Sequence, residues 1–454
     1  MTGTSSESVS GVTPGRTAAL KVFGAVGRGQ RVDRAFASAA SDLDLRERAW
    51  CRELVYGAQR LRGRLDYLLD RRVRRGLDSV DAEVLNVMRL GVYQVLCMDG
   101  VPEYAAVSQT VDLARLVGGQ GASGFVNAIM RATVREKPGE EHFPDFVSDP
   151  AGYLSTWGSH PRWLVERWLE RWPAVDVRRL VEANNAVPPI YLRCFRDTPA
   201  EAARRLSDAG IAATPVGLGT ECVMLHAGSS PIEAMAVVSS VVQDPAAALV
   251  VPFADPAPGD RVADLCAAPG GKAMALAARG NAVLAADRSS ERLRLVAGNA
   301  RRLAARLSDG SSFRVGVVQA DAVHPIVQGA DMILVDVPCT GTGTLRRNPD
   351  ARWRLTPERM EELVKLQGRI LEANSVMVPD GGLLVYSTCS LEPEENEDQI
   401  GAFLSIHPEF ELEPGAGVGK TYLDERGQLF VLPQRTGFDG AFAARLRKRS
   451  GHQG

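Results

Sequence analysis

Apolar positions in the N-terminal part of the chain recur every three or four residues, which is the period of one face of an α-helix. Four stretches between about residues 15 and 135 show it: TAALKVFGAV, RERAWCRELVYGAQRLRGRLDYLL, DAEVLNVMRLGVYQVLCM and AAVSQTVDLARLV. Glycine or proline separates them, at Gly76, at Gly100 with Pro102, and at Gly118-Gly119. The pattern predicts a compact all-α bundle over residues 15–140.

A mixed pattern follows the bundle. Acidic residues and prolines between Lys137 and Pro161 predict a linker over residues 141–160. The segment RWLVERWLERW predicts an amphipathic helix, and we expect its tryptophans to be core residues rather than a base-stacking platform. The strand IYLRCF, the helix TPAEAARRLSDAG and the strand ECVMLHA complete a small α+β domain over residues 161–238.

Short apolar segments alternate with helical ones over residues 239–450. The expected strands are RVADL, AVLAAD, FRVGVVQAD, DMILVD and GLLVYS. Helices are expected in GGKAMALAARG, in SSERLRLVAGNARRLAARL and in TPERMEELVKLQGRILEANSVM, where Thr356 is the N-cap and Pro357 the first helical residue. This alternation predicts an α/β domain whose mainly parallel sheet carries helices on both faces.

The composition is that of a globular protein. The chain has 454 residues, of which 45% are hydrophobic and 24% charged, and this length suggests two to four domains. No apolar run is long enough to cross a bilayer, and MTGTSSESVSGVTPG lacks the apolar segment of a signal peptide. We therefore expect a cytoplasmic protein without a membrane partner, whose residues 1–14 form a disordered tail. Its seven scattered cysteines argue against a disulfide framework.

The net charge of −2 does not indicate a nucleic-acid binder, but binding requires only a local basic patch. One such patch runs from residue 60 to residue 75. Its arginines are Arg60, Arg62, Arg64, Arg71, Arg72, Arg74 and Arg75. They fit a solvated helix face and a phosphate-binding surface about equally well, and we carry them as candidate RNA contacts.

Polar residues stand at the end of every expected strand of the α/β domain. In order they are Asp264 with Cys266, then Asp287, Asp321, Asp336, and Ser387 with Cys389. Because ligands bind outside the carboxyl ends of parallel strands, we expect these side chains to converge on one edge of the sheet. A single aspartate at such a place is usually a turn or cap residue, but successive ones beside a glycine loop indicate a site.

The glycine loop lies in VADLCAAPGGK, directly after the first of these strands. Gly270 and Gly271 permit close approach of the backbone to a ligand. Neither a Walker loop nor the dinucleotide fingerprint fits, since Cys266 and Ala273 occupy positions that a Walker loop gives to Gly and Ser/Thr. Asp287 is spaced to accept hydrogen bonds from a ribose, and Asp321 is placed to meet an adenine. A nucleoside without a phosphate grip indicates S-adenosylmethionine.

Two further thiols occur in DVPCTGTG and YSTCS, at Cys339 and Cys389. A zinc site is disfavoured because the chain has no Cys-x-x-Cys pair and no histidine near either thiol, so we expect no metal. A methyl donor beside a thiol indicates methylation of cytosine at carbon 5, because addition of a thiolate to carbon 6 activates that poor nucleophile. Spacing alone leaves open which of the two thiols attacks. The remaining cysteines are expected to be buried and inert: Cys51, Cys97, Cys194 and Cys222.

The segments DLCAAPGGK, DVPCTGTGTLRRNPDARWR and LLVYSTCSLEPEENE resemble bacterial RNA cytosine-5 methyltransferases of the Sun/Fmu type. The N-terminal half is similar to the NusB-like RNA-binding domain of that group. The resemblance implies a Rossmann-like catalytic domain, Cys389 as nucleophile, Cys339 as an aid to product release, Asp336 in both the catalytic and the cofactor site, and small-subunit (16S) ribosomal RNA as substrate. It implies a cofactor site at Cys266, Ala267, Ala268, Pro269, Gly270, Gly271, Lys272, Asp287, Asp321 and Asp336.

The chain departs from the family pattern at Ala273, at Pro245-Ala246 and in TGFDGAF, none of which is a catalytic position. Two alternatives remain. The same chemistry could act on transfer RNA, or the chain could be a NusB-like assembly factor with a relic methyltransferase domain. The intact glycine loop, acidic strand ends and both thiols argue against a relic. We expect the protein to be a monomer.

Overall fold

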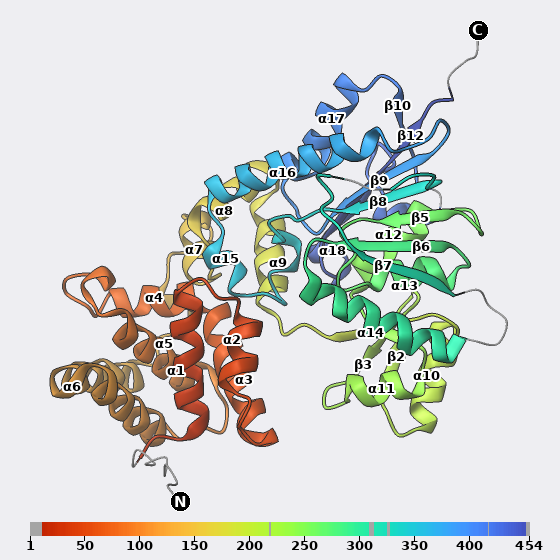
Figure 1. Cartoon of the computed structure of the whole chain (residues 1–454). Helices are drawn as coiled ribbons and strands as arrows, with labels where there is room; N and C mark the ends of the chain where they lie inside the picture. The colour runs from red at the N-terminus through yellow and green to blue at the C-terminus, as the bar shows by residue number, and fades with distance from the viewer. Residues whose placement is uncertain (1–10, 218, 308–312, 325–326, 416, 451–454) are drawn as a thin grey trace, which may run out of the picture. The chain divides into compact units, whose positions relative to one another are not determined.

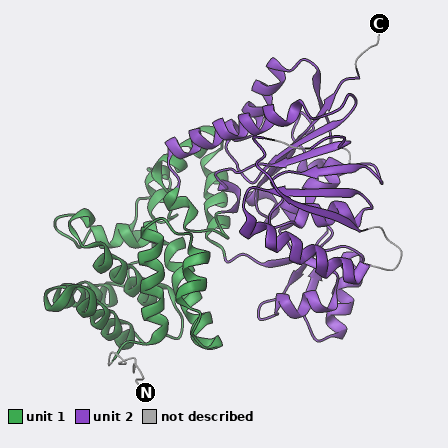
Figure 2. Cartoon of the chain, viewed as in Figure 1, with its two compact units in different colours: residues 1–186, 345–354 green, residues 187–344, 355–454 purple. Residues whose placement is uncertain are grey.

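The structure is a computed structural model that describes residues 11–217, 219–307, 313–324, 327–415 and 417–450. Figure 2 shows its two compact units: unit 1 contains residues 1–186 and 345–354, and unit 2 contains residues 187–344 and 355–454. Residues 1–10 of the predicted tail lie outside the described residues. Each unit has its own core and is considered by itself.

Unit 1 is helical throughout its described part (Figure 1). Its main helices are α1 (Pro14–Gly27), α2 (Val32–Ala39), α3 (Leu45–Arg60), α4 (Arg62–Asp70), α5 (Ala82–Cys97), α6 (Glu103–Glu136), α7 (Pro150–Thr156), α8 (Arg162–Arg171), α9 (Ala174–Asn185) and α15 (Ala351–Arg354), with short 3₁₀ turns η1 (Leu77–Ser79) and η2 (Glu140–His142). This confirms the predicted helical bundle.

The helix boundaries follow the side chains that cap them. Asp44 accepts a hydrogen bond from the Glu47 amide at the start of α3, and Asp81 caps α5 in the same way. The break expected at Gly118-Gly119 is present: Gly119 has the non-helical angles φ +70° and ψ −162°, and it divides α6 into two helical halves.

The stretch expected to be a linker contains helix α7, in which Leu154 is fully buried. Helix α7 contains too few large apolar residues to show a helical period, so the sequence pattern did not predict it. Of the three tryptophans expected in the core, Trp168 is 1% exposed, which confirms its assignment, whereas Trp163 and Trp172 are only half-buried.

A buried arginine joins the segment Leu345–Arg354 to the rest of unit 1. The Arg352 side chain is fully buried, and its Nη atoms donate to the carbonyl oxygens of Ser159 at 3.0 Å and Asn184 at 3.1 Å, and to Asn185 Oδ1 at 2.8 Å. Burial, together with the charge of Arg60, lowers the pKa of Arg352. Hydrogen bonds from the Nη atoms to oxygen atoms thus replace water, while the Nε atom has no partner and no carboxylate among the described residues is bonded to this cation.

Unit 2 begins with a small antiparallel sheet. Its strands are β1 (Ile190–Cys194), β2 (Ala213–Pro215), β3 (Cys222–Leu225) and β4 (Ser240–Val242), in the order β2-β3-β1-β4, and its helices are α10 (Pro199–Asp208) and α11 (Pro231–Val237). The expected strands and helix are present as β1, β3 and α10. The three-residue strands β2 and β4 are too short for the pattern to reveal.

The large sheet of unit 2 has the strand order β10-β12-β9-β8-β5-β6-β7, with β11 paired to β12. Its five parallel strands are the predicted ones: β5 (Arg261–Asp264), β6 (Ala282–Asp287), β7 (Arg314–Gln319), β8 (Met332–Asp336) and β9 (Leu383–Thr388). Three antiparallel strands were not predicted: β10 (Phe410–Glu413), β11 (Leu429–Val431) and β12 (Ala441–Lys448).

Helices cover both faces of this sheet (Figure 1). In β8, Met332 and Leu334 join one buried cluster while Ile333 and Val335 join the other, as the two-residue period of a strand requires. The first cluster contains α12 (Pro245–Ala254), α13 (Gly271–Ala278) and α14 (Ser290–Leu307), and the second contains α16 (Pro357–Ser375) and α17 (Glu397–Ile406). The predicted α/β fold is therefore confirmed.

The N-cap predicted for α16 is present: Thr356 Oγ1 accepts from the Arg359 amide at 3.2 Å, and Pro357 is the first helical residue. Short elements complete unit 2, namely η3 (Thr342–Thr344), η4 (Pro393–Glu395), η5 (Lys420–Tyr422) and α18 (Pro433–Thr436).

We predict that Arg352→Ala destabilises unit 1 by about 3 kcal/mol, because charged hydrogen bonds contribute about 1.5–3 kcal/mol each and part of this offsets desolvation. Tryptophan fluorescence during urea unfolding measures this selectively, since all six tryptophans (Trp50, Trp157, Trp163, Trp168, Trp172 and Trp353) lie in unit 1. The control is Arg115→Ala, whose side chain is 53% exposed. Equal unfolding midpoints in the two variants would contradict the structural role.

Candidate active site

The carboxyl ends of β5, β6, β8 and β9 lie along one edge of the parallel sheet. Strand β5 pairs with β6 on one side and with β8 on the other, so successive connections leave in opposite directions there. A sheet opens a ligand crevice at such a switch point. The residues at these strand ends are Asp264, Asp287, Asp336 and Thr388.

The glycine loop after β5 is held in place by Asp287. One oxygen of this 6% exposed carboxylate accepts from the Ala268 amide at 3.2 Å, and the other accepts from the Ser289 amide at 2.9 Å. Arg292 lies 3.6 Å from the same carboxylate and also donates to the Ala268 carbonyl. Asp287 therefore shapes the loop, in addition to its predicted contact with a ribose.

The backbone of the loop requires a glycine at position 270, whereas at position 271 only the movable end of a side chain stands in the way of a Cβ atom. Gly270 has φ +103°, which favours glycine, and a Cβ atom on it would lie 3.3 Å from Val296. A Cβ atom on Gly271 would lie 2.8 Å from the Gln243 side chain. The small residues thus bring the start of α13 close to α14 and Gln243, and this packing fixes the shape of the loop.

Asp264 is a buried carboxylate whose hydrogen-bonding capacity is unused. It is 1% exposed, and neither oxygen has a partner at full hydrogen-bond geometry within the described part of the chain, although the nearby Cys266 amide is close enough to act against the rise of its pKa. Burial, followed by the charge of Asp336, raises the pKa of Asp264 to about 7. An unsatisfied buried anion is costly unless a ligand supplies the missing donors.

Lys272, the first lysine of α13, connects this loop to β8. Its Nζ atom donates to Asp336 Oδ2 at 2.6 Å, and Ser387 of β9 donates to Asp336 Oδ1 at 2.6 Å. Burial works against the ammonium, but Asp336 and Asp264 outweigh it and raise the pKa of Lys272; a thiolate at Cys389 acts in the same direction. One cation thus lies among two carboxylates and a thiol.

This edge suits S-adenosylmethionine, the cofactor expected from the sequence. Its sulfonium and ammonium groups are cationic and its ribose offers hydroxyl donors, while the edge offers carboxylate acceptors. Asp264 supplies two unused acceptor atoms beside the glycine loop. Asp264, Asp287 and Asp336 are therefore the residues that would hold the cofactor.

The two candidate thiols meet at this edge. Cys339 Sγ lies 3.3 Å from Cys389 Sγ, although 50 residues separate them in the chain. The hydrogen bond to Cys389 and burial raise the pKa of Cys339 well above its usual value. These effects favour the protonated form of Cys339.

The remaining cysteines differ from this pair. Burial raises the pKa of Cys266 strongly, and the nearby carboxylates add to the effect, so this thiol contributes packing rather than reactivity. Burial likewise raises the pKa values of Cys51, Cys194 and Cys222 to about 12 and that of Cys97 to about 11. Within the described part of the chain no group of three or more His, Cys, Asp or Glu side chains could hold a metal ion.

Asp321 follows β7 and is exposed. Its side chain accepts from the Val323 amide at 3.1 Å, as in an Asx turn. The contact of Asp321 with an adenine stays a prediction, as does the contact of Asp287 with a ribose.

Part of the arginine cluster serves the architecture of unit 1. Arg60 is 8% exposed and donates to the Arg346 carbonyl at 3.3 Å. The Arg64 guanidinium lies 3.5 Å from the ring centroid of Trp157 and donates to the Trp157 carbonyl. Because these contacts occupy both guanidinium groups, Arg60 and Arg64 are less able to bind a ligand than arginines on a solvated helix face would be.

Arg62 lies 3.5 Å from Asp66, and Arg72 forms an ion pair with Glu136. Three members of the cluster are exposed: Arg71, Arg74 and Arg75. The RNA-binding role of the seven arginines stays a prediction, and the exposed three are its best candidates.

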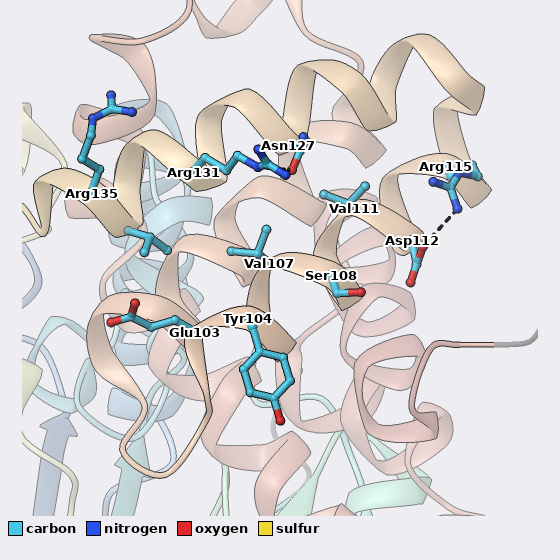
Figure 3. A pocket seen from close by; sticks show the side chains of 11 residues that line it. Glu103, Tyr104, Val107, Ser108, Val111, Asp112, Arg115, Asn127, Arg131 and Arg135 are labelled. Carbon is cyan, nitrogen blue, oxygen red and sulfur yellow. Dashed lines mark hydrogen bonds and ion pairs between the residues drawn. The ribbon is translucent and has the colours of Figure 1, made fainter.

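A second surface that carries arginines lies on α6, where its two halves face each other on either side of Gly119 (Figure 3). The acidic residues Glu103 and Asp112 also line it. A groove of about 660 Å³ separates the two halves. Asn127, Arg131 and Arg135 form a stripe at four-residue spacing on one side, and Tyr104, 79% exposed, lies on the other. Arginines beside an exposed aromatic ring are typical of surfaces that bind single-stranded nucleic acid.

Sequence reasoning placed Asp264 among the strand-end residues of this edge but gave it no role in binding the cofactor or in catalysis. Burial without a partner is a property of the folded neighbourhood, so no local pattern signals it.

No helix within the described residues combines the length and the apolar character needed to cross a bilayer.

Comparison with known families identifies three regions of the chain. The family described as 16S rRNA methyltransferase RsmB/F matches residues 251–447, and the NusB family matches residues 13–135. The ferredoxin-like domain of RsmF/B-like methyltransferases matches residues 160–232.

Similar proteins cover nearly the whole chain. The probable ribosomal RNA small subunit methyltransferase B of Synechocystis sp. is 34% identical over 88% of this chain and 91% of its own length. Ribosomal RNA small subunit methyltransferase B of Yersinia pestis bv. Antiqua is 32% identical over 95% of this chain and 98% of its own. The crystal structure of PH0851 aligns with a TM-score of 0.77 and 24% identity over 96% of this chain and 99% of its own, a similarity of fold.

We predict that S-adenosylmethionine binds roughly tenfold more weakly at pH 6 than at pH 8. A cationic ligand favours the ionised carboxylate of Asp264, so affinity rises as the pH rises through about 7 and then levels off. Titration calorimetry at both pH values measures this. Asp264→Asn should bind weakly and without this pH dependence; an unchanged pH dependence in that variant would exclude Asp264 as the titrating group.

Proposed function

Because the chain belongs to the 16S rRNA methyltransferase RsmB/F family, we propose that it methylates carbon 5 of a cytosine in 16S ribosomal RNA. The observation that carries the chemistry is the pair of thiols, 3.3 Å apart, beside the Lys272–Asp336 ion pair. Methylation of an amino group would need no thiol, whereas methylation of carbon 5 requires a nucleophile at carbon 6.

The chain's own residues divide the reaction between them. S-adenosylmethionine supplies the methyl group when bound. Cys389 adds through its sulfur to carbon 6 of the cytosine, which makes carbon 5 electron-rich enough to accept the methyl group. Loss of the carbon-5 proton then restores the double bond and expels the sulfur of Cys389 as a thiolate. Lys272 and Asp336 hold the cofactor loop and the thiols in one arrangement.

Cys339 is the second thiol of the proposal. Its hydrogen bond to Cys389 and its raised pKa favour a protonated Cys339 while Cys389 attacks. We assign Cys339 to the release of the methylated base. The two relatives named for ribosomal RNA small subunit methyltransferases favour ribosomal RNA over transfer RNA as the substrate.

Unit 1 is the candidate RNA-binding part, since residues 13–135 match the NusB family. The exposed arginines Arg71, Arg74 and Arg75 and the groove of α6 are its two surfaces that carry arginines. Arginine contacts with phosphates make affinity depend on salt, and this dependence can be assigned to particular side chains.

We predict that the double variant Arg74→Ala/Arg75→Ala reduces the slope of log affinity against log salt by about 1.4–1.8, since each phosphate contact on a single strand contributes about 0.7 and on a duplex about 0.9. The pair Arg131→Ala/Arg135→Ala tests the groove in the same way. Filter binding to a 16S RNA fragment across salt concentrations measures both. A control pair on unit 2, Arg359→Ala/Arg435→Ala, should leave the slope unchanged, and a cluster whose removal also leaves it unchanged makes no phosphate contact.

We predict that Cys389→Ala forms no covalent complex with RNA and has no activity. Cys339→Ala, in contrast, should form an RNA complex that survives a denaturing gel, because the sulfur of Cys389 can still add but is released slowly. Both variants are incubated with cofactor and 16S RNA, and methylation is mapped by bisulfite sequencing. The reverse pattern, an adduct in Cys389→Ala and none in Cys339→Ala, would exchange the two roles.

A further inference from the structure

A fully buried carboxylate lies beside the two reactive thiols. Glu395 is 0% exposed and belongs to the 3₁₀ turn η4, six residues after Cys389. Its Oε1 atom accepts from the Thr340 amide at 2.9 Å and from Gln367 Nε2 at 2.8 Å, while Oε2 accepts from the Thr340 hydroxyl. Thr340 directly follows Cys339, so this carboxylate holds one side of the Cys339 loop.

Gln367 of helix α16 holds the other side. The same Nε2 group that donates to Glu395 also donates to the carbonyl oxygen of Pro338 at 2.9 Å. Pro338 and Thr340 flank Cys339 in the chain, so the backbone is anchored immediately before and after the thiol. Gln367 is itself fully buried, so water does not compete for the hydrogen bonds that anchor the backbone on either side of Cys339.

The backbone of Glu395 is fixed as well. Tyr386 of β9, also fully buried, donates its hydroxyl to the Glu395 carbonyl at 2.6 Å. A carboxylate inside a protein is stable only when donors surround it, and here a backbone amide, a hydroxyl and a side-chain amide do so. The arrangement is therefore a rigid connection between the central strands of the sheet and the Cys339 loop.

The Cys389 loop has its own supports. Asn396 donates to the Ser390 carbonyl at 2.9 Å and accepts from Thr388 Oγ1 at 2.6 Å. The Cys389 carbonyl accepts from the Gly343 amide at 3.0 Å. Loss of the Glu395 carboxylate would consequently loosen Cys339 while these bonds still hold Cys389.

We propose that Glu395, together with Gln367, is a positioning residue that holds Cys339 against Cys389 for the release of the methylated base. The inference rests on the proposed function, because release is a step of that reaction. Glu395 touches neither substrate nor cofactor in this role; it acts through Thr340 and the backbone of Cys339.

Electrostatics points the same way as the geometry. The hydrogen bond to Cys389 and burial are the main causes that raise the pKa of Cys339, and the Glu395 carboxylate adds to them. A negative charge fixed beside the loop disfavours a second thiolate there. The carboxylate thus favours the protonated form of Cys339 as well as its position.

The test measures two rates and one complex in Glu395→Ala: methyl transfer in a single turnover, steady-state methylation of 16S RNA, and the RNA adduct on a denaturing gel. We expect single-turnover transfer within threefold of the wild type, steady-state turnover reduced at least tenfold, and an adduct that accumulates as in Cys339→Ala. Glu395→Gln keeps an acceptor for the Thr340 amide and should recover part of the turnover.

Asp398→Asn is the matched control, an exposed acidic residue in the first turn of the following helix, and should behave as the wild type. Gln367→Met removes the bond to Pro338 and one bond to Glu395, but keeps the Glu395 carboxylate with its two bonds from Thr340. It should also accumulate adduct, so it decides the question if Glu395→Ala does not fold. A folded variant in which both rates fall together without adduct, or in which neither changes, would overturn the proposal. Failure of the wild type to methylate RNA would instead overturn the proposed function.

Discussion

The ion pair between Lys272 and Asp336 holds the proposed site together. It connects the glycine loop after β5 to the end of β8, and Ser387 extends the contact to β9. Three separate strand ends thereby become one rigid surface. Without the lysine, Asp264 and Asp336 would be neighbouring carboxylates in a poorly solvated edge, and their repulsion would open it. The pair thus permits an excess of negative charge where a cationic cofactor is expected.

This excess leaves the site less stable than it could be. Asp264 is buried without a hydrogen bond, although an asparagine or an apolar residue at the same place would avoid the cost of burying its charge. Elsewhere in unit 2, Glu395 is equally buried, but both of its oxygens accept hydrogen bonds. The contrast between the two carboxylates indicates different roles. Asp264 has oxygen atoms available to accept hydrogen bonds from a ligand, whereas both oxygens of Glu395 already accept hydrogen bonds from the protein.

The sequence predicted the sheet, its helices and the clustering of strand-end residues, because hydrophobic periodicity and strand-end position are local properties. Such local patterns could not reveal contacts between residues that are far apart in the sequence. Arg60 looked like part of a basic surface, yet it bonds a carbonyl 286 residues away. Strand β12 was missed because its pattern includes buried Arg445, which ordinary periodicity assigns to solvent. The hydrogen bonds that Glu395 and Gln367 make around Cys339 join three separate segments of the chain, and the sequence of any one segment does not reveal them.

The segment Leu345–Arg354 leaves the methyltransferase unit, is counted with the helical unit and returns. The fold is therefore discontinuous in sequence, and no single cut in the gene separates the two units. A fragment beginning at residue 187 would carry Arg352 without the carbonyl oxygens that solvate it. The catalytic unit therefore cannot be obtained by simple truncation, because the chain that builds it also carries ten residues that belong to the helical unit.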